Sequence, residues 1–414
     1  MKRVIVFYEH IVREYYSMEK VVQILKRLSL EPLDVHLRQY DLEWKKSIKE
    51  ARNNGIDAIV VPYLYADDPD YAGVLPFREI NPNCVVINMH HEQISAKYNE
   101  DFQLPNGNLA TNGCFHFVWS EAYAERLKNH GVDEQLISVT GNVRLDATVE
   151  LKSAYSKETL GSLFGLNPKK KWILYSENRR FQKITEKNRL KHPILRSIDP
   201  EIYKELRTLD NASLFKTFEQ INNLSSDFFD SFELIYRLHP GTRLQHRLQD
   251  RVKVVNELPI HDWLRCCDLV LVWNSTTAFE ADVFGTPVIR HESIPSRDLF
   301  RVQGLEAYPV ITELADINEG LIDSLKNEQA GKERYRTVYG AADGLSSYRA
   351  AKEILKLLSN PPNLFPLNDI SGVICSKNRR LLRETIGLIF LRCGLLDCIK
   401  WPRGIYNHKN ELLS

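Results

Sequence analysis

The stretch that decides the fold is DLVLVWNSTTAFEADVFGTPVI, Asp268 to Ile289. Its first six residues predict a buried β-strand that ends at Trp273. Polar residues then mark the start of a helix, and Gly285 and Pro287 turn the chain into a second apolar run, PVIR. A strand, a helix and a strand in this order predict a βαβ unit with parallel strands.

The same alternation extends through most of the chain. Before residue 150, apolar runs such as RVIVFY, DAIVVPYLY, CVVINMHHEQ and CFHFVWS alternate with amphipathic stretches. After a polar stretch, KSAYSKETLGSLFGLNPKKK, a second series contains WILYSE, FELIYRLHP and VKVVN. We therefore expect two α/β domains, at 1–150 and 165–358, followed by a tail at 359–414. The 414 residues are enough for two domains that each bury a core.

Composition limits the class of protein. Hydrophobic residues make up 43% of the chain and charged residues 26%, as in ordinary globular proteins, and the formal charge of +1 argues against nucleic-acid binding by bulk electrostatics. The 7 cysteines form no CxxC pair, which suits a reducing compartment. RVIVFY is expected to be a first strand and not a signal peptide, so we expect a cytoplasmic protein.

The helix start after Trp273 is a candidate anion site. The first amides of a helix lack intrahelical partners and carry partial positive charge, and hydroxyl groups beside them add further donors. The alternative is simple N-capping by one of the polar residues. Glu280, one turn into the helix, is expected to face the same crevice and to accept hydrogen bonds from ribose hydroxyls. The four expected phosphate-binding residues are Asn274, Ser275, Thr276 and Thr277.

A second polar end follows the strand in LIYRLHPGTR, Leu234 to Arg243. Pro240 stops the strand and leaves His239 at its carboxyl end, where parallel sheets bind ligands. Arg237 and Arg243 flank the histidine, and a guanidinium matches phosphate geometry. Alternation along the strand places Arg237 and His239 on the same side. The alternative role of His239 is a hydrogen bond to a neighbouring strand end.

Proton-transfer residues are expected at two other strand ends. VVINMHHEQ predicts that His91 or Glu92 points into a cleft and accepts a proton during attack. No third ligand at a useful spacing is evident, so no metal is expected. In YSENRRFQ, Glu177 is either a base, or a stabiliser of positive charge on the sugar, or the partner of a following arginine in a salt bridge. Asn142 and Arg144, in TGNVRLD, are expected at a hinge bordering the cleft.

Three of these motifs together resemble a known superfamily. WSEAYAERLKNHGV…ISVTGN, YRLHPGTR and NSTTAFEADVFGTPVI are similar to GT-B glycosyltransferases and sugar-nucleotide epimerases, and more narrowly to capsule-type Kdo transferases, polysialyltransferases and teichoic-acid glycerophosphotransferases. The resemblance implies two Rossmann-like domains facing each other across a cleft. It also implies that His239 and Pro240, with Ser275, Thr276 and Thr277, flank the phosphate of a cytidine-linked donor.

The resemblance implies a glycosyltransferase of bacterial capsule or lipopolysaccharide synthesis. A CMP-linked acidic sugar such as CMP-Kdo is the leading donor, the acceptor is a glycan or lipid-linked glycan, and no cofactor is expected. The alternatives are a sugar-nucleotide epimerase, a CDP-glycerol-type glycerophosphotransferase, and a non-catalytic glycan-binding scaffold. The basic amphipathic stretch 378–404 either contacts the inner face of the plasma membrane peripherally or docks on the first domain.

Overall fold

The computed structural model describes residues 1–9, 14–66, 73–150, 155–179, 186–191, 195, 198–239, 244, 246–258, 260–327, 335–360 and 385. The chain forms two compact units. Unit 1 consists of Met1–Gln93, Asp101–Glu150 and Thr337–Ser414, and unit 2 consists of Ile94–Glu100 and Leu151–Arg336.

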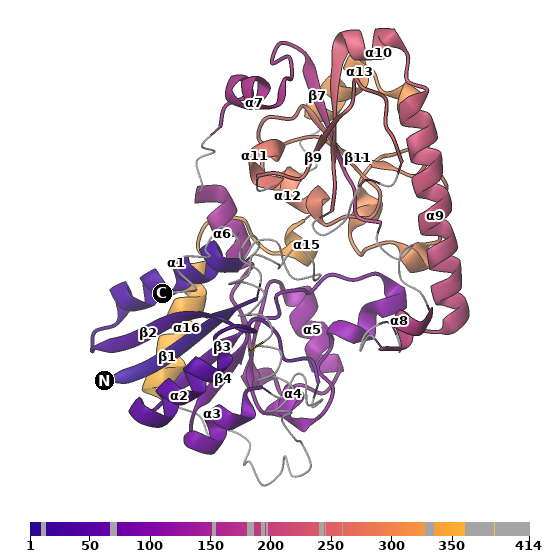
Figure 1. Ribbon diagram of the computed structural model, residues 1–414. Helices are drawn as coiled ribbons and strands as arrows, with labels where there is room; N and C mark the ends of the chain where they lie inside the picture. Colours follow the sequence, from indigo (N-terminus) through magenta and orange to yellow (C-terminus); the bar gives the residue numbers. More distant parts are fainter. Residues whose placement is uncertain are drawn as a thin grey trace. The chain divides into compact units, whose positions relative to one another are not determined.

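Unit 1 is built on a six-stranded parallel sheet with the strand order β2-β1-β3-β4-β5-β6 (Figure 1). The strands are β1 (Lys2–Tyr8), β2 (Leu33–Gln39), β3 (Ala58–Val61), β4 (Val85–Asn88), β5 (Phe115–Val118) and β6 (Ile137–Val139). The short apolar runs of the sequence predicted these strands, and the prediction is confirmed.

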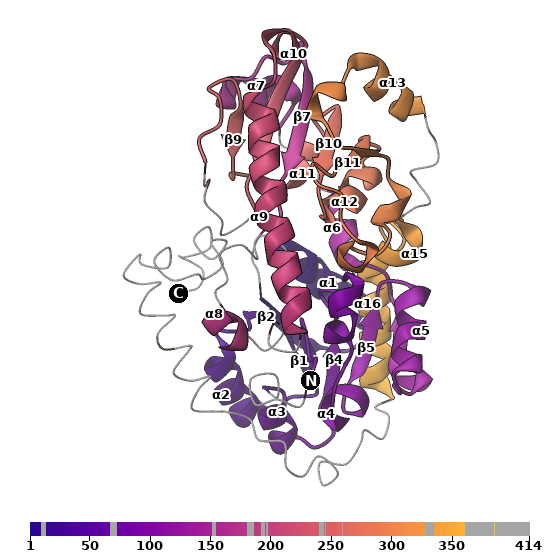
Figure 2. The ribbon, with the colours of Figure 1, turned by 90° about the vertical axis from the view of Figure 1, so that its right-hand side faces the viewer.

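Helices cover both faces of this sheet because its strands are apolar on both sides. In β1, Val4 and Val6 belong to one core cluster and Ile5 and Phe7 to another, as the alternation of a strand requires. Figure 2 shows α2 and α3 on the opposite side of the sheet from α16. The helices of unit 1 are α1 (Tyr16–Leu28), α2 (Trp44–Asn54), α3 (Leu75–Ile80), α4 (Asn108–Asn112), α5 (Glu121–Asn129), α6 (Val143–Glu150) and α16 (Ser346–Ser359).

Helix α16 belongs to a different unit than the expected domain boundary implied. The second domain was expected to run to residue 358, but α16 packs on α1 and α6 of unit 1. Its Ala350, Ala351 and Ile354 are fully buried in the same core cluster as Val21 and Leu25 of α1. The amphipathic pattern of α16 predicted the helix, but such a pattern does not specify which sheet its apolar face will cover.

Unit 2 contains a second six-stranded parallel sheet, with the order β12-β11-β10-β7-β8-β9. Its strands are β7 (Lys171–Ser176), β8 (Phe232–Arg237), β9 (Lys253–Val255), β10 (Leu269–Val272), β11 (Val288–His291) and β12 (Val310–Ile311). Its helices are α7 (Lys157–Phe164), α8 (Glu186–Lys191), α9 (Pro200–Asn222), α10 (Ser226–Ser231), α11 (Ile260–Leu264), α12 (Thr277–Val283) and α13 (Glu319–Asn327), and α15 (Arg336–Tyr339) spans the boundary between the units. Two parallel α/β sheets confirm the predicted fold class.

One segment of the expected first domain belongs to unit 2. Ala96 forms an antiparallel bridge with Val302, and the Gln303 N–H donates to the Ser95 carbonyl at 3.1 Å. The chain therefore enters unit 2 at Ile94 and leaves it at Glu100, inside the range 1–150 that the sequence assigned to one domain. Backbone pairing of this kind leaves little trace in side-chain patterns.

The tail and its predicted membrane contact remain untested. The stretch 378–404 lies outside the described residues except for residue 385. Among the helices that the described residues form, none is long and apolar enough to cross a bilayer.

Candidate functional site

The turn after β4 separates two neighbouring histidines. His90 has a φ of 45°, a left-handed conformation that is rare for a residue with a side chain. The Asn88 Oδ1 atom accepts from the His90 N–H at 3.0 Å, and the Gln93 Nε2 group donates to the His90 carbonyl at 3.0 Å. These bonds hold the turn, and His90 and His91 enter different surroundings.

His90 joins a fully buried chain of hydrogen bonds. His116 Nε2 lies 3.0 Å from the Thr111 carbonyl, which can only accept, so Nε2 carries the proton. His116 Nδ1 lies 2.8 Å from His90 Nε2, which Asn88 Nδ2 also faces at 3.1 Å. Burial lowers the pKa of His116 to about 4 and the pKa of His90 well below its ordinary value. Both rings are therefore neutral at pH 7 and serve the structure of the turn.

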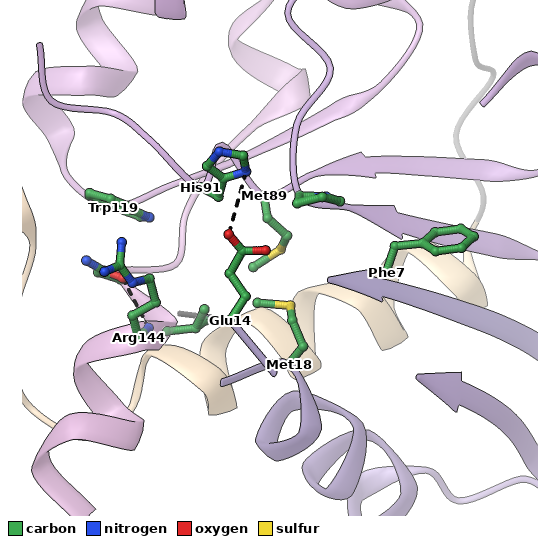
Figure 3. Close-up of a pocket in the computed structure, with 10 residues that line it drawn as sticks. Phe7, Glu14, Met18, Met89, His91, Trp119 and Arg144 are labelled. Atoms are coloured by element: carbon green, nitrogen blue, oxygen red, sulfur yellow. Dashed lines mark hydrogen bonds and ion pairs between the residues drawn. The ribbon is translucent and has the colours of Figure 1, made fainter. Parts of the chain in front are cut away.

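His91 instead lines a cavity with Glu14. The cavity is small, with about 20 Å³ of room for water-sized groups, and its other walls are Phe7, Met18, Pro62, Met89, Trp119, Asn142, Val143 and Arg144. His91 Nδ1 lies 3.9 Å from Glu14 Oε1, and His91 Nε2 lies 3.8 Å from Glu9 Oε2. Figure 3 shows the imidazole above the Glu14 carboxylate, with the side chains of Met18 and Met89 beside it.

The carboxylate of Glu14 is held by the backbone directly after β1. Glu14 is 3% exposed, and its Oε2 atom accepts from the Glu9 N–H at 2.8 Å. The His91 N–H donates to the Pro62 carbonyl at 3.0 Å, which fixes the histidine from the β3 side. An imidazole beside a buried carboxylate can accept a proton from a substrate while the carboxylate stabilises the resulting cation.

The cluster brings two further candidate ligands to His91, which the spacing along the sequence did not show; the expectation that no metal is bound stays a prediction. One ligand atom from each of Glu9, Glu14 and His91 lies within 4.8 Å of the other two, a spacing that a divalent cation could bridge. The spacing along the sequence could not predict this set, because Glu9 and Glu14 follow β1 whereas His91 follows β4.

Two residues expected at a hinge, Asn142 and Arg144, line the same cavity. Gly141, with a φ of 87°, makes the turn that precedes them. The Asn142 Oδ1 atom accepts from the Arg144 N–H at 3.1 Å. Glu92, the other residue expected to accept a proton, is half-buried and does not line the cavity. Of the pair predicted after β4, the structure therefore brings only His91 to the cavity.

In unit 2, the carboxyl ends of strands β10, β7 and β8 lie at the same level of the sheet. Val272 pairs with Ser176, and Ser176 pairs with Arg237, so Asn274, Glu177 and His239 follow at the same edge. The hydroxyl groups of Ser176 and Ser275 lie 3.2 Å and 3.0 Å from Thr277 Oγ1. Three hydroxyl groups therefore meet at the start of α12.

The backbone amides at this helix start are less available than the sequence suggested. The Thr277 N–H faces Ser275 Oγ at 3.3 Å, and the N–H groups of Ala278 and Phe279 donate to the carbonyls of Ser275 and Thr276. Asn274 does not cap the helix: its side chain bonds the Phe300 carbonyl at 2.6 Å and the Val302 N–H at 2.8 Å. A phosphate at this edge, as the sequence predicts, would therefore meet hydroxyl groups and not free helix amides; the prediction of phosphate binding stays a prediction.

Arg237, at the end of β8, and Glu280, in α12, are both buried. Arg237 donates to the carbonyls of Glu257 and Leu258 at 2.9 Å and 2.7 Å, and burial lowers its pKa to about 10 despite the nearby carboxylates of Glu257 and Glu280. Glu280 is buried, with Oε2 3.3 Å from His261 Nε2. Arg237 therefore positions the loop after β9, a role that the sequence did not suggest.

Glu177 forms a salt bridge with Arg179, one of the roles that the sequence left open. Its carboxylate accepts from the Arg179 N–H at 2.6 Å and from Arg179 Nη1 at 2.8 Å, and the Tyr236 hydroxyl donates to it. Arg179 is 1% exposed and stacks over Trp273, with its Cζ atom 4.9 Å from the ring centre. The pair supports the strand that precedes Asn274, and donors from Arg179 and Tyr236 already occupy the Glu177 carboxylate.

The remaining expected residues have less defined positions. His239 is half-buried just beyond β8, and Thr276 is the residue directly before α12. Arg243 and Pro240 lie outside the described residues. The phosphate roles of His239, Arg243 and Thr276 therefore stay predictions.

Sequence reasoning missed Glu9, Glu14, Trp119 and His261. The rule that selected His91, a polar residue directly after a buried strand, also selects Glu9 after β1 and Trp119 after β5. Glu14 and His261 offer no such signal, because Glu14 lies beyond the strand end and His261 lies in α11.

Comparisons with known proteins concern the fold. No family model matches the sequence, and no curated protein matches it. Solved structures do: a UDP-bound MnaA of S. aureus has 16% identity and a TM-score of 0.53, covering 88% of this chain and 100% of that one. A Neisseria meningitidis UDP-GlcNAc 2-epimerase bound to UDP-GlcNAc has 15% identity and a TM-score of 0.52, covering 86% and 100%.

The structure of this chain is also similar to that of a polymerase. The H548A variant of the wall teichoic acid polymerase TagF has 13% identity and a TM-score of 0.52, covering 87% of this chain and 90% of that chain. At such low identity these likenesses concern architecture alone. With its two parallel six-stranded sheets, the chain has the GT-B fold.

Proposed function

We propose that this protein is an enzyme that acts on a nucleotide-linked sugar in the synthesis of a cell-surface glycan. The observation that carries the proposal is the cavity in unit 1, where His91 and the buried carboxylate of Glu14 adjoin an apolar wall at the carboxyl ends of parallel strands. Clefts of this kind bind small molecules, and an imidazole with a carboxylate supplies proton transfer.

The nucleotide is assigned to unit 2. We assign its phosphates to the hydroxyl groups of Ser275, Thr276 and Thr277 and to the imidazole of His239, and its ribose to Glu280. Ser275 and Thr277 lie together at the carboxyl edge, and Ser176 completes the group. The solved structures that share the fold include proteins described with UDP and with UDP-GlcNAc, which supports a nucleotide-linked substrate.

Epimerisation of the sugar is the favoured reaction. An epimerase needs an acid and a base near one carbon atom of the sugar, and the two carboxylates beside His91 supply such groups. Two solved structures with this fold are described as a UDP-GlcNAc 2-epimerase and a putative one, and this likeness favours epimerisation over transfer of Kdo. A transferase that uses a CMP-linked acidic sugar is the second candidate, because the His239–Pro240 and Ser275–Thr277 motifs resemble such enzymes.

The nucleotide is tested first. The full chain is heated with UDP, CDP, CMP and GDP, since a ligand that binds only the folded state raises the melting temperature. Stabilisation by UDP is expected, and stabilisation by CMP alone would support the second candidate.

The reaction is then followed by NMR in D₂O. An epimerase incorporates deuterium at the inverted carbon and leaves the nucleotide attached, whereas a transferase releases the nucleotide only when an acceptor is present. His91→Asn is expected to lower turnover by about 10²–10⁴-fold. His36→Asn is the matched control, since His36 also adjoins a carboxylate, Asp34, but lies outside the cavity. Equal loss in both variants, or no nucleotide-sugar turnover at all, would contradict the proposal.

A further inference from the structure

The imidazole of His91 lies between two carboxylates. Its Nδ1 atom is 3.9 Å from Glu14 Oε1 (Figure 3), and its Nε2 atom is 3.8 Å from Glu9 Oε2. A neutral imidazole carries one N–H, so one of the two ring nitrogens directs a lone pair toward a carboxylate. Two electron-rich groups that face each other repel, and a cation between them removes the repulsion. That cation is either a proton on the ring or a metal ion.

The distances favour a metal ion over a proton. A hydrogen bond from an imidazolium to a carboxylate is about 2.7–2.9 Å long, and the two contacts of His91 are each about 1 Å longer than that. Two ligands of a tetrahedral zinc ion lie about 3.4 Å apart, which is closer to the observed separations. The ring and the carboxylates therefore leave the space of an ion between them.

Glu14 and His91 are held by bonds other than their mutual contact. Glu14 Oε2 accepts from the Glu9 N–H at 2.8 Å, and Glu14 Oε1 faces the histidine. The His91 N–H donates to the Pro62 carbonyl, and the ring meets Tyr63 edge-on, with 5.1 Å between the ring centres. Metal sites use outer bonds of this kind to orient the residues that bind the ion. Two of the three candidate ligands are therefore fixed in position.

We propose that Glu9, Glu14 and His91 bind one divalent transition-metal ion, with Zn²⁺ as the best fit. One ligand atom from each of the three lies within 4.8 Å of the other two. Movements of about 1 Å bring such atoms to zinc spacing, and the Glu9 side chain, 25% exposed, has room to make them. Two carboxylates and a neutral imidazole balance the charge of the ion. The imidazole favours zinc over Mg²⁺ and Ca²⁺, which prefer oxygen ligands.

The cavity beside the cluster provides a place for a fourth ligand. Glu14 and His91 line it, and its room of about 20 Å³ is enough for one water molecule. Asn142 lines the same cavity and is 0% exposed, and its Nδ2 group has no hydrogen-bond partner among the described residues. A buried donor without an acceptor costs stability, and the oxygen of a zinc-bound water accepts from it. Three protein ligands and one water are the usual set of an open zinc site.

The metal ion and the proposed proton transfer exclude each other at His91. A zinc ion occupies the lone pair of the ring nitrogen that otherwise accepts a proton from the substrate. The proposal therefore goes beyond the proposed function, and it implies that bound zinc lowers the turnover of the enzyme.

Zinc uptake tests the proposal without the nucleotide or the sugar. The full chain is treated with a chelator, dialysed, and titrated with ZnCl₂ by isothermal titration calorimetry, with and without MgCl₂ at the same concentration. One strong zinc site per chain is expected, with no competition from Mg²⁺. The absence of a strong site would overturn the proposal, and ¹⁵N NMR of the histidine rings would then show whether His91 carries two protons.

Glu9→Gln and His91→Asn each remove one ligand with little change of shape. Either substitution is expected to weaken zinc binding by about 10²-fold or more, because even the loss of an outer bond in a metal site costs about 10–100-fold. His36→Asn is the matched control: His36 Nε2 also faces a carboxylate, that of Asp34 at 2.9 Å, but this carboxylate already pairs with Arg3. Zinc affinity is expected to be unchanged in the control.

Unchanged zinc affinity in both ligand variants would place the ion elsewhere and overturn the proposal, provided that near-ultraviolet circular dichroism shows both variants to be folded. Calorimetry measures the ion and not the reaction, so this result would leave the proposed function intact. Strong zinc binding at the cluster with no loss of nucleotide-sugar turnover would instead contradict the role of His91 as the proton acceptor.

Discussion

The Nε2 atom of His90 lies 2.8 Å from the Nδ1 atom of His116 in the buried interior of unit 1. The pair holds the turn that presents His91 to the cavity. Protonation of either ring would place a charge in an apolar interior. The turn is therefore sensitive to acid.

Unit 1 is expected to lose stability between about pH 6.5 and about pH 4. The pKa of His116 falls from its ordinary value of 6.5 to about 4 on folding, so the unfolded chain binds protons in this range that the folded chain excludes. Stability therefore falls as pH falls, by at most about 3 kcal/mol from this group. Chemical denaturation at several pH values measures the loss.

His116→Gln tests the source of this dependence. A glutamine retains a donor for the Thr111 carbonyl but does not titrate, so the acid-dependent part of the loss is expected to shrink. His36→Gln is the control, because His36 lies in a partly exposed pair with Asp34. An unchanged pH profile in folded His116→Gln would contradict the assignment.

The positions of the strands were predictable, because apolar runs of four to seven residues between amphipathic stretches leave little choice of structure. The cluster of Glu9, Glu14 and His91 was not. Its proximity depends on the strand order β1-β3-β4, which brings the carboxyl ends of β1 and β4 to the two sides of β3. Nothing in the local sequence of either strand specifies that order.

The roles of Glu177 and Arg237 show a second limit. Both follow the rule for ligand residues at strand ends, and both side chains instead form internal bonds, with Arg179 and with the carbonyls of Glu257 and Leu258. A charged residue at a carboxyl edge is available to a ligand only if no nearby group pairs with it. That condition depends on rotamers and on loop paths, which the sequence pattern does not determine.

Glu177→Gln is expected to destabilise unit 2 by about 3–5 kcal/mol, because it leaves the Arg179 guanidinium buried without its counter-charge. The double variant Glu177→Gln/Arg179→Met is expected to be less destabilised than the single variant, since it removes both charges. Urea denaturation followed by tryptophan fluorescence measures the change near Trp273. A stable Glu177→Gln variant that loses turnover would instead favour the role of Glu177 as a base.

Gly340 contacts the strand end that carries Trp119. A Cβ atom at Gly340 would lie 2.6 Å from the Trp119 carbonyl oxygen, and its φ of 89° already disfavours other residues. Gly344, with a φ of 74°, has open space around the same position. Gly340→Ala is expected to cost about 1–3 kcal/mol more than Gly344→Ala, because only the former adds a steric clash to the backbone strain. Equal melting temperatures of the two variants would show that the loop relaxes freely.

His239 is the residue on which the phosphate assignment in unit 2 depends most. It follows β8 at the edge where Ser176, Ser275 and Thr277 meet. If its imidazole donates to a phosphate as that phosphate leaves or shifts, His239→Ala lowers turnover by about 10²-fold or more and weakens nucleotide binding, with the melting temperature nearly unchanged.

His239→Asn retains a donor and is expected to recover part of the binding. His246→Ala, at an exposed position between β8 and β9, is the control. Normal turnover in His239→Ala would leave the hydroxyl groups as the phosphate site and remove the histidine from it.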